Sequence, residues 1–268
     1  MLNRRWKGAT AAMAAVFMLS APAAHAAWVE VDGTVLSKEQ GWGENGTSYI
    51  TLRALSQLGD YALSWDGEQA RLEGGDLELT AEPGQPYIEV NGRALYVAEG
   101  VGAVEGKTYL PLRVVADATG GVLDWDPQTA TASLELEDRV PPRACYDEEG
   151  LYWLSRIISA ESRGEQLRGQ IAVGNVVLNR VAHENYPNTV KSVIFDDNYG
   201  VQFEPVTNGT VYDEPTENSL LAAKLALEGT DIVGDCIYFY APALSAGAWI
   251  RQNAEYYTTI GCHNFYRE

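Results

Sequence analysis

The chain repeats a short pattern after an interval of 60 residues, and this repeat restricts its first half to two copies of one structural unit. The matching positions are Tyr49 and Tyr109, Leu52-Arg53 and Leu112-Arg113, and Trp65-Asp66 and Trp125-Asp126. Ahead of each copy lies an Asp-Gly or Asn-Gly turn between apolar residues, at 31–35 and 90–94. Each copy is therefore predicted to form a β-hairpin, a helix and a pair of strands.

The expected elements follow the spacing of the apolar residues. We predict helices over 52–58 and 112–118, with strands over 62–65, 70–72, 122–125 and 130–136. Trp65 and Trp125 stand at strand ends, and we expect them to pack in the core rather than to stack against sugar rings.

The first 26 residues have the composition of a secretion signal. Arg4, Arg5 and Lys7 precede an apolar run over 11–19, which is too short to cross a bilayer, and Ala24-His25-Ala26 forms a cleavage site. We therefore expect an exported protein that acts at the cell wall, in the spore or outside the cell, with no later membrane span. Without these residues the net charge of −18 becomes −21, which disfavours nucleic acid and anionic lipid as partners.

A charged stretch that breaks at Pro141-Pro142 predicts a linker over 139–146. It separates a repeat domain, 27–138, from a second domain, 147–268, in which helices are expected over 147–158, 166–182 and 216–228. Two short strands are expected near 236–240 and 263–266. The fold class is α+β, with a small repeated stalk domain before a mostly helical domain that holds a small sheet.

The run Ser159-Ala160-Glu161-Ser162-Arg163-Gly164-Glu165 carries the strongest chemical signal. Glu161 falls at the C-terminal end of an apolar helix, where helix carbonyl groups and low polarity both disfavour a carboxylate. Such a carboxyl keeps its proton near neutral pH, as a general acid requires.

Together with later segments, this run resembles the cell wall hydrolase family typified by the spore cortex-lytic enzyme SleB. The matching segments are 161–165, 169–173, 177–181, 186–190, 202–203, 238–239 and 260–266. Residues 28–137 resemble a copper amine oxidase N-terminal-like stalk domain, although residues 27–138 contain no His, Cys or Met to bind copper.

The resemblance implies a lysozyme-like domain that acts on peptidoglycan glycan strands, with Glu161 as the catalytic acid. Glu165 is a candidate second carboxylate, and a role in tying the loop to backbone amides is an equal alternative. Gln202, Phe203 and Tyr240 are candidate contacts to substrate in a sugar groove. In contrast, Asn179 and Arg180 are interpreted as structural.

The favoured reaction is that of a lytic transglycosylase, which cleaves the muramic acid–glucosamine bond of spore cortex or cell wall during processes such as germination. No cofactor or metal is expected, because two scattered histidines do not form a zinc site. The alternatives are a wall amidase, with or without zinc, and a non-enzymatic wall-binding protein. The stalk domain is a candidate contact for wall or coat proteins.

Three cysteines remain after the signal, and an exported protein can form disulfides. Cys236 and Cys262 lie in one domain and are the candidate pair, with Cys145 left over. Three free thiols are an equal alternative.

Overall fold

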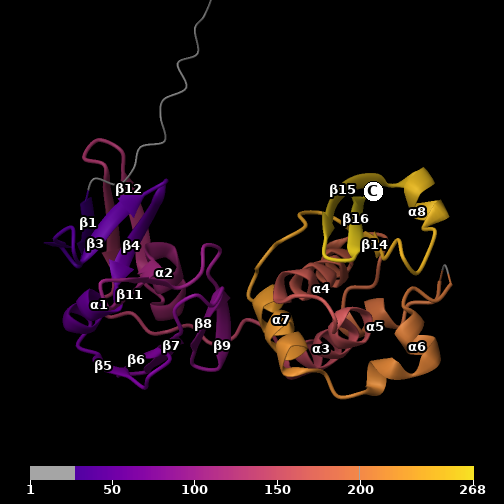
Figure 1. The fold of residues 1–268 in the computed structure, drawn as a ribbon, viewed down its shortest axis with the longest axis horizontal. Helices are drawn as coiled ribbons and strands as arrows, with labels where there is room; N and C mark the ends of the chain where they lie inside the picture. The colour runs from indigo at the N-terminus through magenta and orange to yellow at the C-terminus, as the bar shows by residue number, and fades with distance from the viewer. Residues whose placement is uncertain (1–27, 199) are drawn as a thin grey trace, which may run out of the picture.

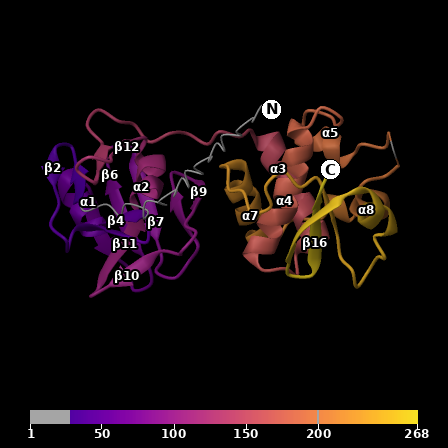
Figure 2. The same ribbon diagram turned by 90° about the horizontal axis from the view of Figure 1, so that it is seen from above.

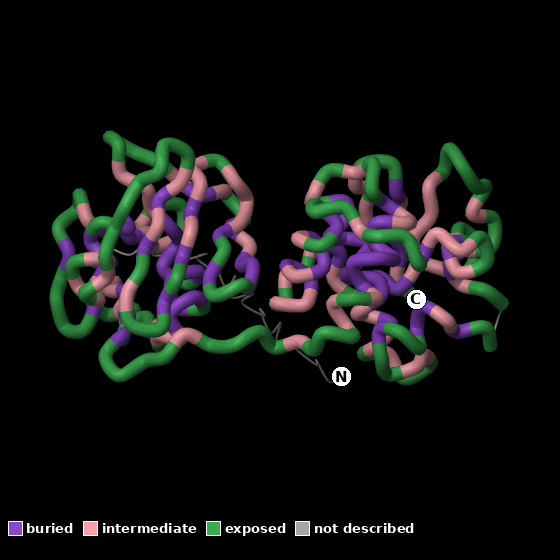
Figure 3. Tube along the Cα trace, turned by 90° about the horizontal axis from the view of Figure 1, so that it is seen from below, coloured by how far each residue is buried: buried purple, intermediate pink, exposed green. Residues whose placement is uncertain are grey.

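The computed structural model describes residues 28–198 and 200–268, so the predicted secretion signal and its cleavage site lie outside the described residues. The chain forms two bodies side by side, an N-terminal one rich in strands and a C-terminal one rich in helices (Figures 1 and 2). Each body has its own buried core, beneath a surface of exposed loops (Figure 3). Among the described helices, none combines the length and apolar character needed to cross a membrane.

The N-terminal domain confirms the predicted repeat and shows that its two copies interlock. One sheet has the order β12-β13-β1-β2 and another the order β5-β6-β7-β8-β9, so the hairpin of each copy shares a sheet with the strand pair of the other. The strands are β1 (Trp28–Val31), β2 (Thr34–Val35), β5 (Ala62–Trp65), β6 (Ala70–Gly74), β7 (Leu77–Ala81), β8 (Tyr87–Val90), β9 (Arg93–Tyr96), β12 (Val122–Asp126) and β13 (Thr131–Glu135). Because of this exchange, the two copies bury one common core.

A third sheet, with the order β10-β11-β4-β3, lies at the centre of the repeat. Its strands are β3 (Gly41–Glu44), β4 (Thr47–Thr51), β10 (Gly102–Val104) and β11 (Lys107–Pro111). The equivalent residues Ile50 and Leu110 lie opposite each other where β4 pairs with β11. Each of these strands leads into a helix, α1 (Leu52–Leu58) or α2 (Leu112–Thr119). The copies are thus related by an approximate two-fold axis through this pairing.

The expectation that Trp65 and Trp125 pack in the core is wrong. Trp65 is 55% exposed and Trp125 is 38% exposed. The aspartate after each tryptophan instead has a structural role, because Asp66 accepts hydrogen bonds from the amides of Glu68 and Gln69 and closes the turn. Both tryptophans lie on strands at the edge of a sheet, β5 and β12, in which no residue is buried.

The C-terminal domain is built around three helices. These are α3 (Glu148–Ser162), α4 (Leu167–Ala182) and α7 (Glu217–Leu227), close to their predicted ranges. The shorter helices are α5 (Val190–Ile194), α6 (Glu204–Asn208), the 3₁₀ turn Thr210–Tyr212 and α8 (Ala248–Asn253). Gly174 lets the three long helices pack closely, since a β-carbon there would lie 2.9 Å from the Ile158 side chain and 3.3 Å from that of Ala226.

A small antiparallel sheet, β14-β16-β15, closes this domain. Strands β14 (Tyr238–Tyr240) and β16 (His263–Arg267) lie within or near the predicted segments, whereas β15 (Glu255–Ile260) was missed. The sheet also rules out the candidate disulfide, because all three cysteines are free. Tyr240 pairs with Asn264 and Tyr238 with Tyr266, which places Cys236 and Cys262 at opposite ends of the sheet, about 20 Å apart along the strands.

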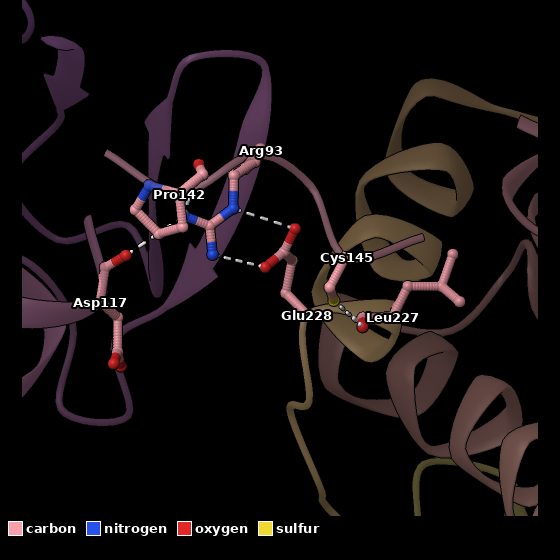
Figure 4. Close-up of polar contacts among 6 residues, drawn as sticks. All are labelled: Arg93, Asp117, Pro142, Cys145, Leu227 and Glu228. Atoms are coloured by element: carbon pink, nitrogen blue, oxygen red, sulfur yellow. Dashed lines mark hydrogen bonds and ion pairs between the residues drawn. The ribbon is translucent and has the colours of Figure 1, made fainter. Parts of the chain in front are cut away.

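The two domains are joined by a buried ion pair as well as by the chain (Figure 4). The Arg93 guanidinium donates to both carboxylate oxygens of Glu228, at 3.1 and 2.6 Å, and both side chains are less than a tenth exposed. Arg93 also donates to the carbonyl oxygens of Asp117 and Pro142. Ala94 next to it belongs to the core of the C-terminal domain. Strand β9 thus docks the repeat domain onto the end of α7.

Candidate active site

Glu161 is the penultimate residue of α3, where the helix leaves the core and meets the loop to α4. Asp147 begins this helix by accepting a hydrogen bond from the Gly150 amide, and Glu148 and Glu149 lie in the favourable first turn. The apolar residues Leu154, Ile157 and Ile158 hold the last turns in the core. The helix therefore delivers the Glu161 carboxyl to a fixed, poorly solvated position.

The environment of Glu161 favours its protonated form. Burial and, to a smaller degree, the nearby Glu204 carboxylate raise the pKa of this carboxyl to about 7, against the opposing effect of the Arg180 charge. Within the described residues, no hydrogen bond or ion pair holds its carboxylate oxygens. A carboxyl with a pKa near 7 can both donate and accept a proton at neutral pH.

Among the described residues, Arg180 is the cation whose charge lowers the pKa of Glu161. It lies in the last turn of α4, is 5% exposed, and donates from Nε to the Ile237 carbonyl oxygen at 2.8 Å. Its Nη1 atom is buried without a hydrogen-bond partner. The sequence interpretation of Arg180 as a structural tie explains the first contact only, because burial of Nη1 without a hydrogen-bond partner is costly and is not explained by that tie.

A cavity of about 720 Å³ opens beside Arg180, between α4 and the sheet β14-β16-β15. Its lining comprises Arg180, Asn185, Tyr186, Gln202, Tyr238, Phe239, Trp249, Ile250 and Glu268. Aromatic faces with a few polar groups form the type of surface that binds sugar rings. Glu161 is not among the lining residues, and Arg180 is the group that links its carboxyl electrostatically to the cavity.

The structure separates the three predicted groove residues. Gln202 lines the cavity. Phe203, in contrast, is 2% exposed and packs in the core, so the expected substrate contact through its side chain is wrong. Tyr240 lies on β14 outside the lining and stacks on Tyr266, with ring centroids 5.7 Å apart. Trp249, which no motif indicated, lines the cavity and packs edge-on against Tyr238.

Glu165 ties a loop in this structure. Its Oε1 atom accepts a hydrogen bond from the Cys262 amide at 3.1 Å and lies 3.5 Å from Nδ1 of His263. A β-carbon at Gly261 would overlap its carboxylate, so the turn between β15 and β16 is shaped around it. These contacts match the loop-tying alternative and connect the segment after Glu161 to the sheet.

The carboxylate that acts on Glu161 is Glu204, which the sequence analysis missed. It is the first residue of α6, is exposed, and directly follows the Gln202-Phe203 pair. Only the folded chain brings it near α3, although its place next to a matched motif was an available signal. Across 28–198 and 200–268, no three His, Cys, Asp or Glu side chains converge as metal ligands would.

Comparisons with known proteins match a different family to each of the two domains. The family described as "Cell Wall Hydrolase" matches residues 164–266, and the "Copper amine oxidase N-terminal domain" family matches residues 30–134. The chain therefore combines a cell wall hydrolase domain with a copper amine oxidase N-terminal domain. The cell wall hydrolase match begins three residues after Glu161, in the loop that Glu165 ties.

Several curated relatives of this cell wall hydrolase domain are named spore cortex-lytic enzyme. The Bacillus cereus protein is 35% identical over 105 residues, which are 39% of each chain. The Halalkalibacterium halodurans protein is 32% identical over 140 residues, 52% of this chain and 41% of that one. The chain thus spans about two fifths of the length of these relatives.

Two solved structures are also similar. The catalytic domain of the germination-specific lytic transglycosylase SleB from Bacillus anthracis is 32% identical, and the match covers 47% of this chain and all of that one, with a TM-score of 0.43. The catalytic domain of the Bacillus cereus SleB protein is 33% identical, with 47% and 94% covered and a TM-score of 0.42.

Proposed function

We propose that this protein cleaves the glycan strand of peptidoglycan at the muramic acid–glucosamine bond, as a lytic transglycosylase. The observation that carries the proposal is the Glu161 carboxyl, whose pKa is raised to about 7, mainly by burial, and which interacts with Arg180, a residue that lines the aromatic cavity. The names of the relatives support peptidoglycan as the substrate and spore cortex as its source. The composition of residues 1–26 supports export.

The chemistry needs one carboxyl group. Protonated Glu161 donates its proton to the glycosidic oxygen as the bond from that oxygen to C1 of the muramic residue breaks. The C6 hydroxyl of the same residue then attacks C1, and its proton passes to the Glu161 carboxylate. The enzyme is restored, no water is consumed, and the product ends in an anhydro sugar.

Arg180 and Glu204 set the balance between the two forms of this carboxyl. Glu204 favours the protonated form that begins the reaction, and Arg180 favours the carboxylate that ends it. Arg180 lines the cavity, where it would bind a polar group of the substrate, and Tyr186 and Trp249 would supply apolar faces for sugar rings.

Hydrolysis is the second candidate, because Glu204 is an exposed carboxylate whose charge acts on the Glu161 carboxyl. In that reaction Glu204 would activate a water molecule, as in glycosidases that use paired carboxyl groups. Glu165 is less suited, because the Cys262 amide already occupies one of its oxygens.

Digestion of purified peptidoglycan, followed by mass spectrometry of the products, tests the proposal. The wild-type protein is expected to release anhydro-muramic ends, which are lighter by one water than hydrolysis products. Glu161→Gln is expected to lose activity by about a thousandfold or more, because a proton donor in the transition state is gone. Products with reducing ends would identify a hydrolase, and cleaved amide bonds would identify an amidase. Intact peptidoglycan that remains bound would identify a wall-binding protein.

A further inference from the structure

Two equivalent pockets lie on the surface of the N-terminal domain, one in each half of the repeat. The first is lined by Leu52, Arg53, Leu63, Ser64, Trp65, Ala70, Gly106, Lys107 and Thr108, and encloses about 180 Å³. The second is lined by Gly46, Thr47, Ser48, Pro111, Leu112, Arg113, Leu123, Asp124, Trp125 and Ala132, and encloses about 270 Å³. Each pocket takes its helix and tryptophan from one copy and its hairpin turn from the other.

The repeated residues divide into structural and surface members. Leu52 and Leu112 are 1% exposed and belong to the core. The aspartates after the tryptophans close turns through hydrogen bonds. In contrast, neither Arg53 nor Arg113 forms an ion pair with another described residue, and both are exposed.

The surface members meet in the same place in both copies. Arg53 and Trp65 line the first pocket, and Arg113 and Trp125 line the second. Core packing accounts for the leucines and turn hydrogen bonds for the aspartates, but neither accounts for the exposed rings or for the two guanidinium groups, of which Arg113 interacts only electrostatically with Asp117. A large exposed aromatic ring beside a free cation is a combination that suits a ligand.

The two pockets differ in charge. Arg53 and Lys107 both line the first pocket, and no acidic side chain is part of its lining. The second pocket has Thr47 in place of Lys107 and Asp124 in place of Ser64. A doubly cationic pocket is notable in a chain whose formal charge is −18, because it gives the first pocket a preference for an anionic group.

We propose that the first pocket binds an acidic saccharide, with the sugar ring on Trp65 and its carboxylate on Arg53 and Lys107. A carboxylate suits the forked guanidinium, and the flat face of a sugar ring suits the indole. This proposal rests on the proposed function for the identity of the ligand, a muramic acid unit that carries a carboxylate either on its lactyl group or, where a peptide is linked to that group through an amide bond, on the peptide. The N-terminal domain would then hold the glycan strand that the C-terminal domain cuts.

The position of the pocket agrees with a role in holding the strand. Helix α1 and strand β5 lie at the end of the N-terminal domain away from the C-terminal domain (Figures 1 and 2). Strand β9 and the Arg93–Glu228 ion pair lie at the other end and fix the orientation of the two domains. The pocket is thus free to bind a strand without disturbing the docked interface.

Binding is tested in the full chain with Glu161→Gln as the background, so that the sugar is not cleaved. The soluble probe is N-acetylmuramyl-L-alanyl-D-isoglutamine, with N,N′-diacetylchitobiose as a neutral sugar and succinate as a carboxylate without a sugar. NMR signals of the tryptophan ring N–H groups report which indole is contacted. Arg53→Gln and Trp65→Ala are compared with Trp28→Ala and Arg139→Gln, which change an exposed indole and an exposed arginine outside both pockets.

The muramyl probe is expected to shift the Trp65 signal. Either pocket variant is expected to weaken binding by about tenfold, the usual effect of losing a charge-assisted hydrogen bond in Arg53→Gln or an aromatic stacking contact in Trp65→Ala. The two control variants are expected to bind as the background does, and added salt is expected to weaken binding. Equal binding of the neutral sugar, or unchanged binding by Arg53→Gln and Trp65→Ala, would overturn the proposal. Because the assay requires no cleavage, loss of the proposed enzyme activity would leave its outcome readable.

Discussion

Glu161 and Glu228 show how the same side chain at the same kind of position serves opposite purposes. Glu161 is the penultimate residue of α3 and Glu228 caps the C-terminus of α7, so both carboxyl groups lie where helix carbonyl groups disfavour negative charge. Both are also withdrawn from water. Glu228 is bound by two nitrogen atoms of Arg93, whereas no described residue forms a hydrogen bond or ion pair with the Glu161 carboxylate.

The comparison shows that the presence of a cationic partner, more than burial itself, determines whether a buried carboxyl group has a structural role or can transfer a proton. A bidentate guanidinium compensates the charge on Glu228 and makes it a structural link between domains. Glu161 has no such partner, and its pKa is raised to about 7, mainly by burial. A carboxyl group with this pKa can give up and take back a proton near neutral pH.

Removing the charge of Glu228, the carboxyl group that has a cationic partner, is expected to have the largest effect on stability. Glu228→Gln leaves Arg93 buried without its counter-charge, so the free energy of unfolding should fall by about 3–5 kcal/mol. Chemical denaturation monitored by tryptophan fluorescence measures this loss. The matched control is Glu135→Gln, which breaks the exposed pair with Arg139 and should cost less than about 1 kcal/mol. Equal losses in the two variants would mean that the domains are not held together by the buried pair.

Replacing the unpartnered carboxyl is expected to stabilise the protein in alkaline solution. The folded state holds the proton of Glu161 up to a pKa of about 7, so its contribution to stability is complete below pH 4.5 and is lost as the pH rises through 7. Glu161→Gln stays neutral, and at pH 8 it should be more stable than the wild type by up to about 3 kcal/mol.

This gain should disappear below pH 4.5, where both side chains are neutral. Denaturation curves measured from pH 4 to pH 9 give the profile, and Glu184→Gln, a change at an exposed position, is the control. A difference between Glu161→Gln and wild type that does not vary with pH would show that Glu161 ionises normally.

Glu165 offers an intermediate case, because its partner is a backbone amide. Glu165→Ala removes the acceptor of the Cys262 N–H group and should cost about 1–3 kcal/mol of stability. Glu165→Gln keeps an acceptor oxygen and should cost less. Both variants should retain the pH dependence of turnover seen in the wild type, measured on solubilised glycan, if Glu165 only holds the loop. Loss of one of the ionisation steps in that pH profile would indicate that Glu165 acts as the second carboxylate in the reaction.

The smallest expected effect is a difference in reactivity among the three thiols, one of which is buried and two of which are exposed. Burial raises the pKa of the Cys236 thiol to about 11, so it should react with iodoacetamide only after unfolding. Cys145 and Cys262 are exposed and should react in the native state. Mass spectrometry counts the modified residues. A disulfide between Cys236 and Cys262 in the native protein would contradict the strand register.

The sequence predicts the elements well where a local pattern determines them. The 60-residue interval, the turn signals and the apolar spacing located α1, α2, α4 and β5 to within a few residues. Exchange of strand pairs between the two copies could not be predicted, because it depends on which hairpin a strand meets after collapse. The same limit explains why β7, β15 and the four strands of the central sheet, β3, β4, β10 and β11, were missed.

The residues of the candidate active site also divide into those that a local sequence pattern predicts and those that only the folded chain brings together. Glu161 could be predicted, because its helix end and its motif are local features. Glu204 and Arg180 could not be placed beside it, since α3, α4 and α6 meet only in the folded domain. Phe203 was misread because a motif position does not tell which way a side chain points, and the exposed Trp65 was misread for the same reason.

The pH at which Glu161 loses its proton tests the central claim most directly. Carbon-13 NMR of protein labelled at the glutamate side-chain carboxyl carbon, with Glu161→Gln to assign the signal, follows this single group through a titration. The account predicts a midpoint of about 7, raised by burial without a partner. A midpoint near 4.5, the ordinary value for glutamate, would show that the carboxyl is solvated or paired and would contradict its assignment as the acid.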